Sequence, residues 1–152
     1  MVAVVGLLIT TGCPPAVCNG PDPYVDEIKY ELVSASPAYQ GGVVRIIAVV
    51  KNKGTAPFIS GQGQQSIQIF ETDNYISNLV HQQEFVNIEL DGTIEAVYQT
   101  NWSRGDEFRP PFYKVMIAYD PDIFIDGNPQ NDDCNLGNNQ LIRDTSGLDT
   151  FF

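Results

Sequence analysis

The sequence contains few of the residues from which most metal and catalytic sites are built. It has 1 histidine and 3 cysteines in 152 residues, too few for the usual zinc frameworks, which need four Cys or His ligands at short spacings. Basic residues are also scarce, with 8 against 19 acidic residues and a formal net charge of −11. Nucleic acid and anionic membrane surfaces repel a chain of this charge. The composition therefore excludes nucleic acid as a partner.

The N-terminus carries an apolar run that is too short to cross a membrane. Residues Met1–Ile9 are nearly all aliphatic, whereas a spanning helix needs about 20 apolar residues. The run leads into Thr10-Thr11-Gly12-Cys13 and has the shape of an export signal. The Gly12-Cys13 pair resembles the end of a bacterial lipoprotein signal, so we expect export with Cys13 acylated as a lipid anchor. The alternatives are a structural strand that packs on this subunit or on a neighbour, and an incorrectly assigned start.

The odd cysteine count fits an exported lipoprotein. If Cys13 carries lipid, Cys18 and Cys134 remain to form one disulfide. Closing so long a loop would stabilise the fold by about 4 kcal/mol. The alternative is that the three cysteines are unrelated thiols.

The rest of the chain has the pattern of a strand-rich domain. It is 43% hydrophobic and 18% charged, which suffices for one compact core. From Tyr24 onward apolar residues recur with a period of two, and we find no helical period. Strands are expected at Ile28–Leu32, Val43–Lys51, Ser66–Glu71, Tyr75–Val80, Glu84–Leu90, Thr93–Trp102, Phe112–Tyr119 and Gln140–Arg143.

This pattern predicts an all-β protein, an immunoglobulin-like antiparallel β-sandwich of about seven or eight strands. We divide the chain into an apolar arm at 1–12, a linker at 13–23, the sandwich at 24–145 and a C-terminal tail at 146–152. The expected inward-facing positions are Ile46, Ala48, Ile69, Tyr98, Val115 and Ile117.

Two motifs carry a family resemblance. Near the start, Gly41-Gly42 precedes an apolar strand that runs into Asn52-Lys53-Gly54-Thr55-Ala56; near the end, Tyr113–Asp120 enters an Asp-rich loop and Asn138-Asn139 precedes the last strand. These residues resemble the CARDB family, the cell-adhesion-related domain found in bacteria. The resemblance implies a seven-stranded sandwich, an extracytoplasmic location and an adhesive or spacer role. In an immunoglobulin-like sandwich the chain start and the last connection lie at one end, which would place Cys18 near Cys134.

The last long loop is the only candidate metal site that we identify. Flexible spacing of carboxylate and amide oxygens suits Ca²⁺, although the pattern does not fit an EF-hand. The alternative is a solvated acidic loop. The candidate ligands are Asp120, Asp122, Asp126, Asn128, Asp132 and Asp133.

No residue pattern indicates catalysis. His81 follows an apolar strand with no nucleophile motif nearby, so we expect no enzyme and, apart from calcium, no cofactor. Trp102 shares a face with Ile94, Ala96 and Tyr98 and is expected in the core, with a sugar platform as the alternative. Phe151 and Phe152 would be exposed in the tail unless something covers them, so this segment could dock on a partner.

The leading hypothesis is a non-catalytic interaction or structural module at the cell surface, anchored through Cys13 or free outside the cell. Its partner would be a protein, either a second copy or another surface protein. One alternative is a subunit of a surface filament or virion that assembles through the N-terminal arm. A further alternative is a carbohydrate-binding module.

Overall fold

The computed structural model describes residues 18–36, 40–73 and 76–152. The apolar arm at 1–12 and Cys13 lie outside these residues. The expected export signal or structural strand, and the expected lipid anchor, therefore fall outside the described part of the chain. Within the described ranges, no helix has both the length and the apolar character needed to span a bilayer.

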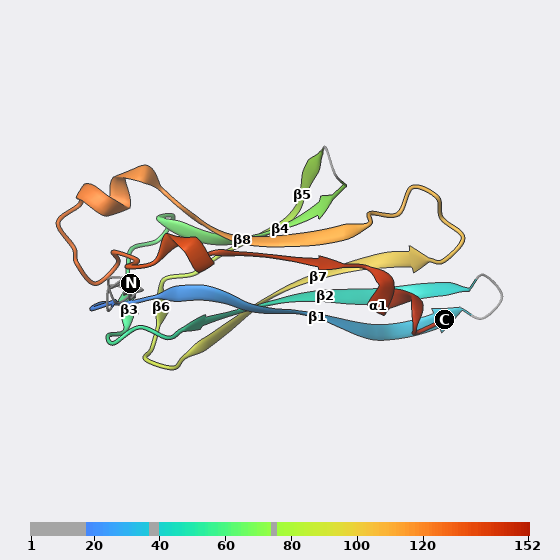
Figure 1. Ribbon diagram of the computed structural model, residues 1–152, viewed down its shortest axis with the longest axis horizontal. Coiled ribbons are helices and arrows are strands. Elements are labelled where there is room, and N and C mark those ends of the chain that lie inside the picture. The colour runs from blue at the N-terminus through green and yellow to red at the C-terminus, as the bar shows by residue number, and fades with distance from the viewer. Residues whose placement is uncertain (1–17, 37–39, 74–75) are drawn as a thin grey trace, which may run out of the picture.

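Two antiparallel sheets pack face to face, with their strands running along the long axis of the molecule (Figure 1). In the first sheet, β2 (Gly41–Asn52) lies between β1 (Pro23–Ser36) and β7 (Thr93–Ser103). The second sheet has the order β5 (Ser77–Glu84), β4 (Gln65–Thr72), β8 (Phe112–Tyr119) and β9 (Gln140–Asp144). The prediction of an all-β immunoglobulin-like sandwich is therefore confirmed.

The core fills the space between the two sheets. Ile46, Ala48 and Ile69 have no exposed surface, and their outward-facing neighbours alternate with them as a pleated strand requires. Tyr98 is half-buried and packs against the same cluster. The remaining predicted inward positions, Val115 and Ile117, are also buried.

The predicted strand Glu84–Leu90 is divided in the structure. β5 ends at Glu84, and β6 comprises only Asn87–Ile88, paired with β3 (Phe58–Ile59). Phe85 and Ile88 both turn into the core, while the carbonyl of Phe85 accepts a bond from the side chain of Gln65 instead of a strand neighbour. Phe85 and Ile88 therefore mark burial at a corner of the sandwich and not a continuous ladder.

Three short helices lie in the C-terminal quarter: η2 (Pro121–Ile125), η3 (Leu136–Asn138) and α1 (Ser146–Asp149). None is long enough to show a 3.6-residue period, which is why the sequence did not predict them. At η2 the start is specified locally, because the Asp120 side chain accepts a bond from the backbone N–H of Asp122 and Pro121 is the first helical residue.

The C-terminal segment does not form an exposed tail. Leu148 has no exposed surface and belongs to the core. Phe151 and Phe152 are partly buried and pack against the same core, with their rings edge to face at 6.4 Å. The two aromatic residues are therefore partly covered by their own chain, and their docking on a partner stays a prediction.

Candidate functional site

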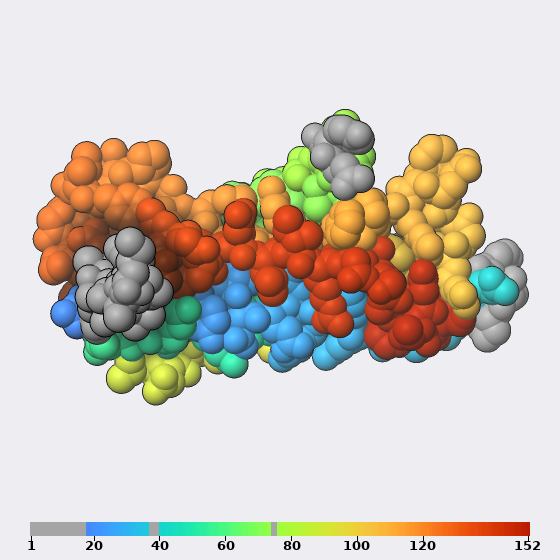
Figure 2. Space-filling model, in the orientation of Figure 1, coloured from blue at the N-terminus to red at the C-terminus, as the bar shows by residue number. Residues whose placement is uncertain are grey.

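The two ends of the sandwich hold the polar groups that could serve a function. One end carries the loop at 120–139, and the other carries the loop at 104–111 together with the C-terminus (Figure 2).

A disulfide between Cys18 and Cys134 ties the first end together, with 5.6 Å between the two Cα atoms. The backbone supports this link, because the N–H of Cys134 donates to the carbonyl of Pro21 at 3.1 Å. Gly54 packs so closely on the carbonyl of Gly20 that a side chain there would overlap it. The pair Cys18 and Cys134 is the one that the cysteine count selected, and the described part of the supposed linker at 18–22 is integrated into this end.

The carboxylates of the long loop mainly bond to the loop itself. Asp120 caps η2, and Asp126 accepts bonds from the backbone N–H of Asn128 at 2.7 Å and from the side chains of Gln64 and Asn131. The bond from Asn131 is the main cause that lowers the pKa of Asp126. Asp122 and Asp132 are exposed.

Two buried carboxylates lie beneath the disulfide. Asp133 is 7% exposed and accepts bonds from the Tyr119 hydroxyl at 2.9 Å and from the Asn139 amide at 2.7 Å. Asp22 is 4% exposed and accepts a bond from the Asn138 amide at 2.8 Å. Burial raises the pKa of the Asp133 carboxyl, and the charge of Asp22 adds to this effect.

The donors around Asp133 are fixed by the same environment. Burial, followed by the negative charge of Asp133, raises the pKa of Tyr119, so its hydroxyl stays protonated and donates. The amide oxygens of Asn138 and Asn139 make no hydrogen bond within the described structure. This end is thus a rigid polar network rather than an open cleft.

The six candidate calcium ligands do not converge on one point. Among the residues with described positions, the group of His, Cys, Asp or Glu whose ligand atoms lie within 4.8 Å of one another is Cys18, Asp22 and Cys134. Both sulfur atoms of that group are held in the disulfide, so they are not thiolate ligands. Asp22 is therefore the group's one carboxylate donor.

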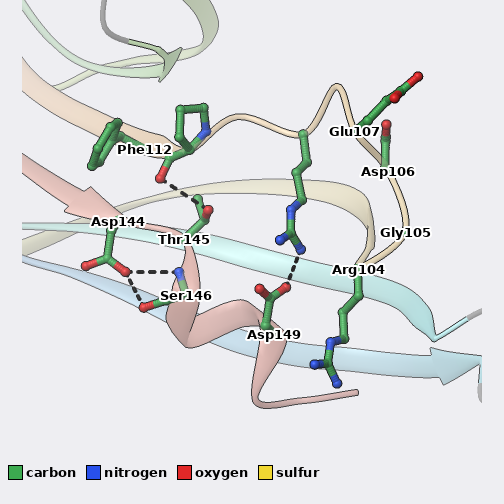
Figure 3. A pocket seen from close by; sticks show the side chains of 11 residues that line it. Arg104, Gly105, Asp106, Glu107, Phe112, Asp144, Thr145, Ser146 and Asp149 are labelled. Atoms are coloured by element: carbon green, nitrogen blue, oxygen red, sulfur yellow. Dashed lines mark hydrogen bonds and ion pairs between the residues drawn. The ribbon is translucent and has the colours of Figure 1, made fainter.

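The opposite end has a cavity of about 640 Å³ between the loop at 104–111 and the segment at 144–149 (Figure 3). Arg109 reaches across it to Asp149 at 2.5 Å. The same Asp149 oxygen accepts the indole N–H of Trp102 at 3.2 Å, and the Arg109 guanidinium lies 5.5 Å from the centre of the Trp102 ring. These contacts join the loop, the sheet and α1.

Polar side chains around this cavity also form hydrogen bonds within the chain. The Arg104 guanidinium donates to the carbonyl of Phe152 at 3.0 Å, and the Thr145 hydroxyl donates to the carbonyls of Pro110 and Pro111. Ser146 bonds to Asp144 through both its hydroxyl and its backbone N–H. The cavity is bordered by structural bonds, and of the residues that make them only Phe152 was singled out from the sequence.

The remaining sequence candidates have structural surroundings. Trp102 is 4% exposed, as expected for the core. His81 faces the interior of the sandwich, where its ring stacks on Tyr98 at 6.5 Å, and its buried Nε2 has no hydrogen-bond partner in the described part of the chain. The sequence analysis named Asn52 only as part of a motif; its buried side chain accepts the N–H of Asp22 and donates to the carbonyl of Ala56. Its place in the Asn-x-Gly turn indicates a bond to the local backbone, whereas the bond to the distant Asp22 depends on the fold.

Comparisons with known proteins give distant likenesses. No protein-family model and no curated protein matches the sequence. The chain is similar to the CARDB domain of a Pyrococcus furiosus protein in complex with di-metal ions, at 19% identity and a TM-score of 0.45, over 84% of this chain and 89% of that one. A CARDB domain is therefore among the solved structures that this chain resembles, as the sequence motifs predicted.

Two other solved structures are less similar. The ApaA protein from Bordetella pertussis gives 17% identity and a TM-score of 0.35, over 67% of this chain and 80% of that one. A β-glucosidase from Erythrobacter marinus gives 16% identity and a TM-score of 0.32, over 66% of this chain but only 14% of the enzyme. At such low sequence identity and structural similarity, the functions of these proteins are not assigned to this chain. The fold assignment rests on the strand order of the two sheets.

Proposed function

We propose that the protein is a non-catalytic interaction module that works outside the cytoplasm. The observation that carries the proposal is that polar side chains at both ends of the sandwich bond to other groups of the same chain. Asp133, Asp149 and Arg109 are bonded to their own chain, which stabilises a shape. A catalytic site would instead direct such groups toward a substrate.

The disulfide supports the extracytoplasmic part of the proposal, because such bonds persist mainly in oxidising compartments. The test is to express the full chain in a bacterial host, block free thiols before lysis, and analyse the cysteines by mass spectrometry. We expect Cys18 and Cys134 to be resistant to the blocking reagent until a reductant is added. A matched chain lacking residues 1–12 should be retained inside the cell and react at both cysteines. Blocking of both cysteines in the full chain would contradict the proposal.

Lipid attachment at Cys13 belongs to the same proposal and is tested separately. Feeding the host an alkyne-bearing fatty acid should label the wild-type chain. Cys13→Ala should lose the label, whereas Cys18→Ala should keep it. Equal labelling of the wild type and Cys13→Ala would exclude the anchor without affecting the interaction module.

Calcium binding at the loop 120–133 is a second candidate function. Asn131 favours it: the side chain has no exposed surface, its Nδ2 donates to Asp126 at 2.8 Å, and its amide oxygen has no hydrogen-bond partner in the described structure. A buried amide oxygen without a hydrogen-bond partner is the type of ligand that Ca²⁺ takes. Calorimetric titration with CaCl₂ should show binding that Asp126→Asn weakens at least tenfold. Heat no larger than that of a MgCl₂ dilution control would exclude it.

A further inference from the structure

The outer faces of the two sheets differ in chemistry. On the three-stranded sheet, ion pairs cross between strands: Lys29 lies 3.2 Å from Glu95, and Arg45 lies 4.0 Å from Glu31. Lys29, Ile47 and Val97 form one cross-strand row, and Ile47 is only 5% exposed. This face is solvated and largely covered by its own charged side chains.

The outer face of the four-stranded sheet has few charges and several exposed apolar groups. One cross-strand row consists of Leu79, Phe70, Lys114 and Ile142. Leu79 is 49% exposed and Ile142 is 56% exposed. The next row consists of Gln82, Gln68, Met116 and Gln140. We call these two rows the amide–aliphatic face.

We propose that the amide–aliphatic face binds the same face of a second copy of this chain. The inference goes beyond the proposed function and does not depend on where the protein is located. It rests on the chemistry of the two rows, on their charge and on their size.

The two rows are self-complementary, as a symmetric dimer requires. Glutamine side chains both donate and accept hydrogen bonds, and Gln68 already donates to Gln82 at 3.4 Å. The Lys114 ammonium lies 4.5 Å from the centre of the Phe70 ring. Each copy therefore offers both the cation and the ring of this contact.

The register permits the contact to form between copies. Phe70 and Lys114 are directly paired on β4 and β8, the two central strands of the sheet. A twofold axis parallel to the strands would place β4 of one copy over β8 of the other without changing the row. Lys114 of each copy would then face Phe70 of its partner, while Leu79 and Ile142 would meet at the margins.

Charge favours this face over the rest of the surface. Two copies with a net charge of −11 each repel one another, so association requires a surface with little negative charge. The eight residues of the two rows contain one charged residue, Lys114, which is positive. A strongly acidic macromolecule would find only that single cation on the face. A second copy offers glutamine, aliphatic and aromatic side chains that are complementary to both rows.

The size of the face predicts a weak dimer. The two rows extend roughly 20 Å across four strands spaced by about 4.8 Å and roughly 14 Å along them. Their area of about 280 Å² is well below the roughly 800 Å² that a standard interface buries on each partner. We therefore expect a dissociation constant on the order of 100 μM. Added salt should strengthen the dimer, because salt screens the repulsion between two acidic chains.

The test is sedimentation equilibrium of the intact protein up to about 1 mM, at low and high salt. We expect Ile142→Asp and Leu79→Asp each to weaken dimerisation at least tenfold. Val97→Asp is the matched control, because Val97 is an aliphatic residue with 41% exposure on an edge strand of the other sheet. Thermal unfolding of each variant establishes that it is folded, and dimerisation is compared only among folded variants.

Three results would overturn the proposal. One is a wild-type chain that remains monomeric throughout this range, which would leave the face to a different partner. Another is an equal loss of dimerisation in Val97→Asp and Ile142→Asp. The third is amide-exchange protection on dimerisation confined to the outer edge of β5 or β9, which would indicate strand addition. None of these results would affect the thiol and lipid tests of location.

Discussion

The two ends of the sandwich are stabilised by different means. At one end a disulfide joins Cys18 to Cys134 above a network of buried amides and carboxylates. At the other end the closure is noncovalent, through Leu148 in the core and the bond from Trp102 to Asp149. Covalent closure restricts the unfolded chain, whereas noncovalent closure depends on packing in the folded state. The ends should therefore respond differently to reduction, truncation and pH.

The largest effect is expected from removing the disulfide. The double variant Cys18→Ser, Cys134→Ser should lose about 4 kcal/mol of stability in urea unfolding, because the closed loop spans 116 residues. Reductant should lower the stability of the wild type by a similar amount and leave the double variant unchanged. Cys13→Ser serves as the control and should unfold like the wild type. A loss below about 1 kcal/mol would mean that the polar network alone holds this end.

Truncating the packed residue at the opposite end should have the next largest effect. Leu148→Ala should cost about 3 kcal/mol, because Leu148 has no exposed surface and the change leaves a cavity. Leu136→Ala is the control, since Leu136 is 55% exposed and should change stability by less than about 0.5 kcal/mol. Equal effects of the two substitutions would show that residues 146–152 do not contribute to the core in solution.

The sequence predicted the sandwich better than the closure of its ends. Alternating residues in β2, β4 and β8 record burial between two sheets, so their positions follow from a period of two. Leu148 gives no such signal, because α1 has four residues and its burial depends on a contact with distant strands. The sequence likewise left open whether anything covers Phe151 and Phe152, since the exposure of a short segment depends on where the chain turns back.

The candidate sites show the same division. The pair Cys18 and Cys134 could be proposed from the cysteine count together with the topology. The bonds of Asp133 to Tyr119 and Asn139 could not, because they join the middle of the loop to the end of β8 and to the residue just before β9. A run of acidic residues indicates local charge, whereas the role of each carboxylate depends on which donors the fold brings to it.

Removing the carboxylate of Asp149 should have a moderate effect at the noncovalent end. Asp149→Ala leaves the indole N–H of Trp102, which is 4% exposed, without its partner. The expected cost is about 1 to 2 kcal/mol, since the partly exposed ion pair with Arg109 adds little. Tryptophan fluorescence should shift, and because Trp102 is the one tryptophan in the chain, the shift reports this site directly. Arg109→Lys keeps the acceptor for Trp102 and should leave the emission maximum unchanged.

The smallest effect is expected from pH at the disulfide end. Burial raises the pKa of Asp133 in the folded state, so its ionisation opposes folding. Below the pKa of the unfolded state, about 3.9, Asp133 is neutral in both states and its full contribution to stability is present. That contribution is lost as the pH rises through the higher pKa of the folded state. Asp133→Asn removes this titration. Its amide can retain the bond from the Asn135 N–H, while the Tyr119 hydroxyl can rotate to accept. The stability of the wild type relative to Asp133→Asn, followed by urea unfolding from pH 3.5 to 7, should therefore fall as pH rises. An opposite slope would show that the hydrogen bonds to the carboxylate outweigh its desolvation, which would make this end an anion-stabilising network.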